Sequence, residues 1–175
     1  MNRERKKSPA YKAAFAGVML ALTIALSWVE NVLISDVPFL PPGVRLGISN
    51  VVIMYCLIYV SPAGAAGLGA AKVLFVFATR GATAGIMSAC GTAASLIFMY
   101  IFSRIFKERS PVMLGIIGAL AHNAGQLLGM AALMSSWSVF VYAPVLVLSG
   151  IAAGILTGLC LKGMARALAK ASLNP

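Results

Sequence analysis

Apolar residues occur along this chain in long, nearly uninterrupted stretches that short polar or proline-containing segments separate. The stretches cover residues 12–34, 46–60, 63–79, 82–103, 112–134 and 140–165. A helix needs about 20 residues, or as few as about 17, to cross the hydrocarbon core of a bilayer. The pattern therefore predicts an all-α protein: an integral membrane bundle of about six transmembrane helices, forming a single transmembrane domain over residues 1–175.

The boundary between the second and third stretches is the least defined. Residues 46–60 are fewer than a span needs, and only Ser61 and Pro62 separate them from residues 63–79. Two separate spans and one re-entrant hairpin both fit this pattern. The first stretch is too long for the apolar region of a signal peptide and no clear cleavage signal follows it, so we expect it to be a membrane helix.

Composition supports a lipid environment. Hydrophobic residues make up 61% of the 175 residues and charged residues only 10%, against about 25% charged residues in soluble domains. The formal net charge is +10, but the basic residues lie at the ends of apolar stretches, so we expect no nucleic-acid partner. A soluble domain of this composition could not cover its surface with polar groups.

The basic residues also predict an orientation. Eleven of the fourteen fall into three groups that six spans would place on one side of the membrane. The groups are Arg3, Arg5, Lys6, Lys7 and Lys12; Arg104, Lys107 and Arg109; and Lys162, Arg166 and Lys170. Cytoplasmic loops carry an excess of lysine and arginine, so we expect both termini in the cytoplasm.

The sequence lacks the residues that several kinds of catalytic or metal-binding site need. The three cysteines are far apart and the chain has one histidine, which predicts no metal site. No phosphate-binding G-x-x-x-x-G-K-[ST] loop occurs, and Asp36 is the only aspartate, so ATP hydrolysis and an aspartate-rich magnesium site are not expected. We therefore predict a protein that is not an enzyme and holds no cofactor.

Polar residues within the apolar stretches are the candidates for function, because burying them in a membrane costs free energy. With six spans, the helices place them in the outer half of the bundle. The candidate ligand-binding residues are Glu30, Asn31, Arg45, Asn50, Lys72, His122, Asn123 and Gln126. Their cations and amides suit a small polar ligand that carries a carboxylate or a phosphate. The alternative is that these groups pair with one another and only lock the bundle.

Helix faces add two details. His122 and Gln126 are four residues apart and share a face, where Gly118 and Gly129 leave space beside them. Ala13, Gly17 and Ala21 form a stripe of small residues that begins at the cytoplasmic end of the first helix. Such stripes let helices approach closely in lipid, so this stripe is a candidate docking surface for a partner helix, with internal packing as the alternative.

Two segments carry a family resemblance. Residues 42–50, PGVRLGISN, and residues 118–126, GALAHNAGQ, resemble the bacterial Gx transporter family, which is also catalogued as heptaprenyl diphosphate synthase component I. That family is similar to the substrate-binding S components of energy-coupling factor (ECF) transporters. Arg45 stands where the family commonly has lysine, and Ser49 where it commonly has alanine.

The resemblance implies a fold, a site and partners. It implies a six-helix S component in the bacterial cytoplasmic membrane, with a small nutrient or cofactor precursor bound near the outer face. Ala13, Gly17 and Ala21 would meet a membrane coupling protein, and separate ATPase subunits would supply energy. Two other interpretations stay open: a non-catalytic membrane partner in isoprenoid or quinone synthesis, and a membrane subunit of a flavin-linked electron-transfer system.

Overall fold

The computed structural model describes residues 8–34, 47–106 and 110–170. Helices make up 93% of these residues, and the described ranges contain no strand. In chain order the elements are α2 (Pro9–Ile34), α3 (Asn50–Tyr59), α4 (Pro62–Ile105), α5 (Pro111–Met134), the 3₁₀ helix η1 (Trp137–Tyr142) and α6 (Ala143–Lys170). The prediction of an all-α protein is confirmed.

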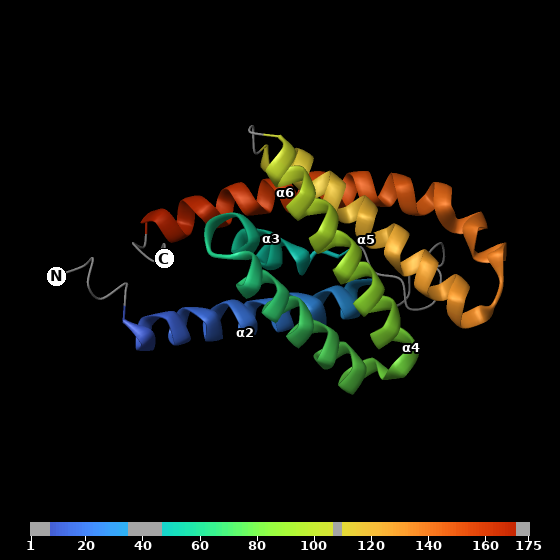
Figure 1. Ribbon diagram of the computed structural model, residues 1–175, viewed down its shortest axis with the longest axis horizontal. Coiled ribbons are helices and arrows are strands. Elements are labelled where there is room, and N and C mark those ends of the chain that lie inside the picture. Colours follow the sequence, from blue (N-terminus) through green and yellow to red (C-terminus); the bar gives the residue numbers. More distant parts are fainter. Residues whose placement is uncertain (1–7, 35–46, 107–109, 171–175) are drawn as a thin grey trace.

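The expected number of six helices is not supported, since the described chain forms five α-helices. The stretches 63–79 and 82–103 both lie within the 44 residues of α4, which is interrupted only at Gly81, where φ is 83° and ψ is 178°. Glycine adopts this positive φ without steric cost, so α4 bends sharply there and its two arms, 62–80 and 82–105, form a V (Figure 1).

In the part of the chain that the structure describes, four helices are long and apolar enough to cross a membrane: α2, α4, α5 and the unit that η1 forms with α6. Helix α3 has ten residues, and Val52, Met54 and Tyr55 on it have no exposed surface. A helix that is apolar on all sides belongs inside a protein or a membrane. Helix α3 therefore fills the core of the bundle, against α2, α4 and α6.

Glycines set the close approach of α4, α5 and α6. A Cβ on Gly154 of α6 would lie 2.4 Å from Ile116 Cα of α5, and one on Gly158 would lie 2.5 Å from Val112 Cα. A Cβ on Gly125 of α5 would lie 2.5 Å from Cys90 O of α4. Small residues allow such backbone contact where lipid gives helices little hydrophobic reason to associate.

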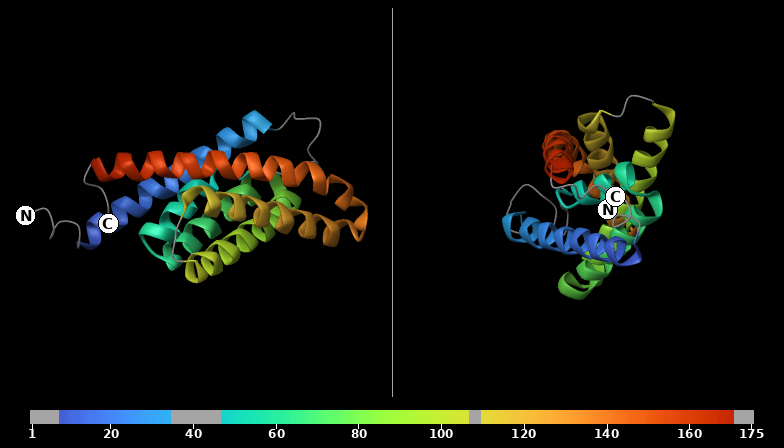
Figure 2. Two further views of the ribbon diagram at one scale, coloured as in Figure 1. Left: turned by 90° about the horizontal axis from the view of Figure 1, so that it is seen from above. Right: turned by 90° about the vertical axis from the view of Figure 1, so that its left-hand side faces the viewer.

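The ends of the helices gather at two ends of the bundle. The start of α2, the turn between α3 and α4, and the end of α6 lie towards one end, and η1 lies at the other (Figures 1 and 2). We call the first the basic end, because Lys12 lies in the first turn of α2 and Lys162, Arg166 and Lys170 lie in the last part of α6. The end of α2, the bend of α4 and η1 lie towards the opposite end.

Candidate functional site

A cluster of polar side chains lies inside the bundle, contributed by α2, α3, both arms of α4, and α5. Each member exposes 6% or less of its surface. The members are Glu30, Ser49, Asn50, Lys72, Ser88, Thr92, Ser95, His122, Asn123 and Gln126. We call this set the polar cluster; it contains six of the eight ligand-binding residues predicted from the sequence.

Hydrogen bonds of Glu30 connect the end of α2 with the residues that precede α3. Its carboxylate accepts hydrogen bonds from the Gly47 backbone N–H and, at 3.4 Å, from the Ser49 hydroxyl. Gly47 has a φ of 79°, and a Cβ there would lie 2.8 Å from Asn50 Nδ2. Only glycine meets both requirements, so the carboxylate sits against backbone that a larger residue could not form.

Lys72 and Asn50 form the central contact of the polar cluster. The Lys72 ammonium, on the first arm of α4, donates a 2.8 Å hydrogen bond to Asn50 Oδ1 on α3. The ammonium also attracts the Glu30 carboxylate and is repelled by the Arg80 guanidinium. An intramembrane charge is costly and is expected to face the bundle interior with polar partners, as it does here.

The polar side chains of α5 contact two different helices, α4 and α6. His122 and Gln126 share the face that packs on Gly91 of α4, where a Cβ would lie 2.9 Å from both side chains. Asn123 instead donates a 2.8 Å hydrogen bond to Leu146 O of α6. The structure therefore brings His122 and Gln126 together, whereas the Asn123 amide group contributes to the contact between α5 and α6.

Two small cavities lie within the polar cluster, each of about 10 Å³. The first is lined by Glu30, Lys72, Arg80, His122 and Gln126, among others. The second is lined by residues that include Asn50 and Ser95. Each has room for about one water molecule.

The space expected beside Gly118 and Gly129 is occupied. A Cβ on Gly118 would lie 2.7 Å from Met99 Sδ, and one on Gly129 would lie 3.1 Å from Cys90 Sγ. These glycines bring α4 and α5 together rather than opening a large pocket.

Five buried polar atoms of the cluster have no hydrogen-bond partner in the described part of the chain. They are Asn50 Nδ2, Thr92 Oγ1, Ser95 Oγ, His122 Nδ1 and Asn123 Oδ1. Native proteins leave few buried polar groups unsatisfied, so a concentration of such groups marks a place where water, an ion or a ligand can bind. Among the described residues no group of three histidine, cysteine or acidic side chains could hold a metal ion.

The sequence prediction missed the hydroxyl residues of α4. Ser88, Thr92 and Ser95 follow one another at intervals of four and three residues, which places them on one helix face. This spacing was the available signal. Of the remaining predicted residues, Asn31 is half-buried on α2, and Arg45 lies outside the described residues.

The predicted docking stripe is on the surface. Ala13, Gly17 and Ala21 are exposed, and a Cβ on Gly17 would meet no atom within 4 Å. The described chain therefore does not use these residues for close packing between its own helices.

The comparisons with known proteins identify one family. A family model described as heptaprenyl diphosphate synthase component I matches residues 19–164. The chain belongs to this family. The matched range contains the whole polar cluster, so the cluster lies within the region that defines heptaprenyl diphosphate synthase component I. No curated protein and no solved structure matches the chain, so a likeness to S components gains no support from the comparisons.

Proposed function

We propose that the chain is the substrate-binding membrane subunit of an ECF-type uptake transporter for a small polar nutrient or cofactor precursor. The observation that carries this proposal is the polar cluster, in which five buried polar atoms have no hydrogen-bond partner among the described residues. Leaving one such group unpaired costs about 1–3 kcal/mol. A cluster that only held the helices together would be more stable with every polar group paired. A ligand site, in contrast, must keep some polar groups available for the ligand.

The charges and amides of the cluster define the ligand chemistry. Lys72 and Arg80 line one cavity, where they favour a carboxylate or a phosphate. Asn50 Nδ2 and the hydroxyls of Thr92 and Ser95 would take the neutral hydrogen-bonding part of the same molecule. Cavities of about 10 Å³ are far below the roughly 300–1,000 Å³ of ligand pockets, so binding requires the helices around the cluster to separate.

In this proposal the two arms of α4, of about 19 and 24 residues, are separate crossings, since each is long enough to cross a bilayer. The ten-residue α3 is shorter than a span needs, and it returns the chain inside the bundle towards the basic end. The basic end would face the cytoplasm of a bacterium. Both termini would then be cytoplasmic, and the polar cluster would lie nearer the outer surface.

Transport also requires partners, since the sequence contains no phosphate-binding loop for ATP. In this proposal the exposed stripe Ala13, Gly17 and Ala21 docks a membrane coupling protein at the basic end. Separate ATPase subunits bind that coupling protein. The chain itself binds its substrate without chemical change.

The family description favours a second candidate, a non-catalytic membrane partner in isoprenoid or quinone synthesis. Prenyl elongation needs clusters of acidic residues to hold magnesium diphosphate, and the sequence has four acidic residues in total. Glu30, the only acidic residue in the described ranges, is bonded to Gly47 and Ser49. In this role a separate soluble subunit would carry the catalysis.

Native mass spectrometry of the purified chain separates the two candidates. The transport role predicts a small polar molecule retained by the parent and lost from Gln126→Ala, with both proteins equally folded. A parent that retains no polar molecule, but raises prenyl diphosphate turnover by a synthase subunit from the same bacterium, would replace the first candidate with the second.

A further inference from the structure

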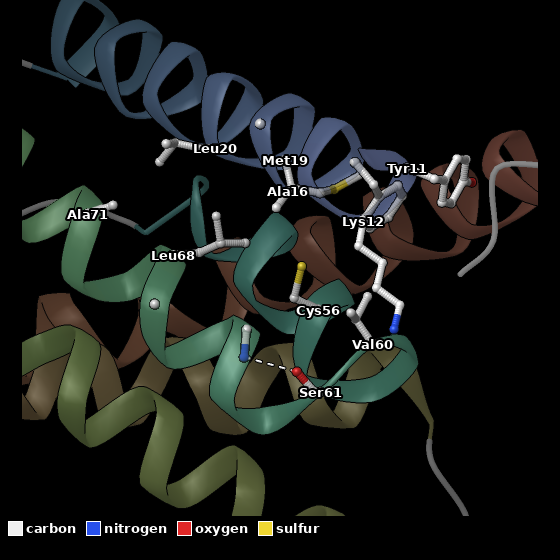
Figure 3. Close-up of a pocket in the computed structure, with 14 residues that line it drawn as sticks. Tyr11, Lys12, Ala16, Met19, Leu20, Cys56, Val60, Ser61, Leu68 and Ala71 are labelled. Atoms are coloured by element: carbon white, nitrogen blue, oxygen red, sulfur yellow. Dashed lines mark hydrogen bonds between the residues drawn. The ribbon is translucent and has the colours of Figure 1, made fainter. Parts of the chain in front are cut away.

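A large apolar groove opens on the surface of the bundle at its basic end. The groove has a volume of about 680 Å³ and lies between α2, α3 and the first arm of α4. Its lining includes Phe15, Met19 and Leu20 from α2, Cys56 from α3, and Leu68 from α4 (Figure 3). The volume falls within the range of pockets that enclose whole small molecules, and the polar cluster does not contribute to it.

Small residues keep this groove open. Gly17 on α2 and Gly67 on α4 both line it, and a Cβ added to either would meet no atom within 4 Å. From Tyr11 to Leu20 the lining follows α2 for about 14 Å. The groove is therefore an elongated slot with apolar walls, a shape that matches an extended hydrocarbon chain.

The mouth of the groove carries a cation and an aromatic pair. Lys12 extends from α2 towards Val60 and Ser61 at the turn between α3 and α4 (Figure 3). The rings of Tyr11 and Phe15 stack with centroids 6.5 Å apart beside it. Lysine and tyrosine are typical of the level of lipid headgroups, which places the mouth at a membrane surface.

The charge of the mouth is not neutralised within the described chain. Glu30 is the only acidic side chain in the described ranges, and it lies 18 residues from Lys12 along α2, a distance of about 27 Å. The end of α6 lies at the same end of the bundle (Figure 2), and its sequence contains Lys162, Arg166 and Lys170. A negatively charged group at the mouth would therefore be attracted mainly by Lys12, which lines the groove, and only weakly by the other basic residues of this end, which do not line it.

From this combination we propose that the groove binds one phospholipid with a net negative headgroup. The phosphate lies at Lys12, and one acyl chain lies in the slot between α2 and α4. The site is separate from the polar cluster and does not depend on what the polar cluster binds. It shares Gly17 with the stripe Ala13, Gly17 and Ala21, so a bound lipid would form part of the surface offered to a partner helix.

Native mass spectrometry of the full chain tests this with two probes that have identical acyl chains, phosphatidylglycerol and phosphatidylcholine. We expect one phosphatidylglycerol to be retained in preference to phosphatidylcholine. Lys12→Gln should weaken that preference about fivefold, the effect of removing one basic residue near an anionic headgroup. Lys162→Gln, which removes an exposed cation of α6 at the same end, should leave it nearly unchanged.

A second pair of variants tests the slot. Gly67→Leu places a side chain in the groove and should reduce phosphatidylglycerol retention about tenfold or more. Gly163→Leu is the matched control, because a Cβ on Gly163 also meets no atom within 4 Å and α6 does not line the groove. Melting temperatures will show whether each variant is folded. If Gly67→Leu does not fold, the result for Lys12→Gln alone tests the proposed lipid site.

Three results would overturn the proposal. The first is equal retention of phosphatidylcholine and phosphatidylglycerol by the parent. The second is unchanged retention in both Lys12→Gln and a folded Gly67→Leu. The third is displacement of phosphatidylglycerol by an equimolar prenyl diphosphate, which would assign the groove to a different lipid.

Discussion

The Lys72 ammonium donates a 2.8 Å hydrogen bond to Asn50 Oδ1, while the Nδ2 atom of the same asparagine has no partner in the described chain. One side of the Asn50 amide therefore stabilises a buried cation, and the other side remains available. Asn50 thus both binds the charged Lys72 and contributes one of the unpaired polar atoms of the polar cluster. A substitution of Asn50 should therefore affect both stability and ligand binding.

Asn50→Ala should destabilise the ligand-free protein as well as weaken ligand binding. It removes the oxygen that accepts from Lys72, so the ammonium keeps its electrostatic attraction to Glu30 but loses its hydrogen bond within the described chain, which costs about 1–3 kcal/mol of unfolding free energy. Lys72→Met in the Asn50→Ala background should restore part of that loss, because a buried ammonium without a hydrogen bond is then no longer present. Unfolding in denaturant measures both effects, and equal stability of Asn50→Ala and the parent would show that the hydrogen bond contributes little.

The sequence pattern located the long helices because their apolar stretches are long and their ends carry proline or charge. Residues 12–34 and 112–134 were expected, and the structure has Pro9–Ile34 and Pro111–Met134. The break expected between residues 79 and 82 falls at Gly81, where α4 bends between its arms 62–80 and 82–105, although the two arms count as one element. The expected start of the second stretch at residue 46 was early, because α3 begins only at Asn50, after Gly47 with its φ of 79°.

For the candidate site, spacing along one helix was informative and contacts between helices were not. The shared face of His122 and Gln126 follows from their separation of four residues. The hydrogen bond from Asn123 to Leu146 O depends on where α6 crosses α5, which no pattern within α5 encodes. Thr92 and Ser95 were overlooked because hydroxyl residues are common in membrane helices, where they often bond to their own backbone.

The crossing of α5 and α6 should be sensitive to single methyl groups. Gly154→Ala puts a Cβ 2.4 Å from Ile116 Cα, and backbone cannot move aside as a side chain can. We expect a loss of about 1–3 kcal/mol in unfolding free energy. Gly163→Ala on the same helix meets no atom within 4 Å and should change stability by far less, which thermal melts of both variants will show.

Cysteine labelling in intact bacteria tests the proposed orientation. Trp137 is 76% exposed at the start of η1, so Trp137→Cys should react with a membrane-impermeant maleimide added outside. Arg166→Cys, at the basic end, should react only after the cells are opened. Parent cells give the background from Cys56, Cys90 and Cys160. External labelling of Arg166→Cys with protection of Trp137→Cys would reverse the assigned orientation.

The exposed stripe on α2 should be needed for a membrane partner and not for folding. Ala13→Leu and Gly17→Leu add bulk where the described chain makes no close contact, so melting temperatures should stay near that of the parent. Each should reduce copurification of the coupling protein, because the two helices can no longer approach closely. Gly163→Leu on α6 is the control for adding an exposed leucine. Full copurification with both α2 variants would leave the stripe without a docking role.

Thr92→Val distinguishes a ligand-binding role of the polar cluster from a purely structural role more clearly than a substitution of any charged residue in the cluster would. The Thr92 hydroxyl is buried and has no partner in the described chain, so replacing it with a methyl group of similar shape removes no hydrogen bond. The ligand-free protein should be as stable as the parent or slightly more stable, since an unsatisfied polar group no longer has to be buried.

The matched control for Thr92→Val is Thr23→Val. Thr23 has no exposed surface, lines neither cavity of the polar cluster and donates a 2.8 Å hydrogen bond to Met19 O, so its replacement should cost about 0.5–1.5 kcal/mol of unfolding free energy. Ligand affinity should show the opposite order: Thr92→Val should bind about tenfold more weakly than the parent, a loss of roughly 1.4 kcal/mol, and Thr23→Val should bind as the parent does. Melting temperature and ligand affinity measured on the same two proteins give this crossed pattern only if the unpaired hydroxyl is kept for a ligand. Unchanged affinity of Thr92→Val would exclude Thr92 from the binding site.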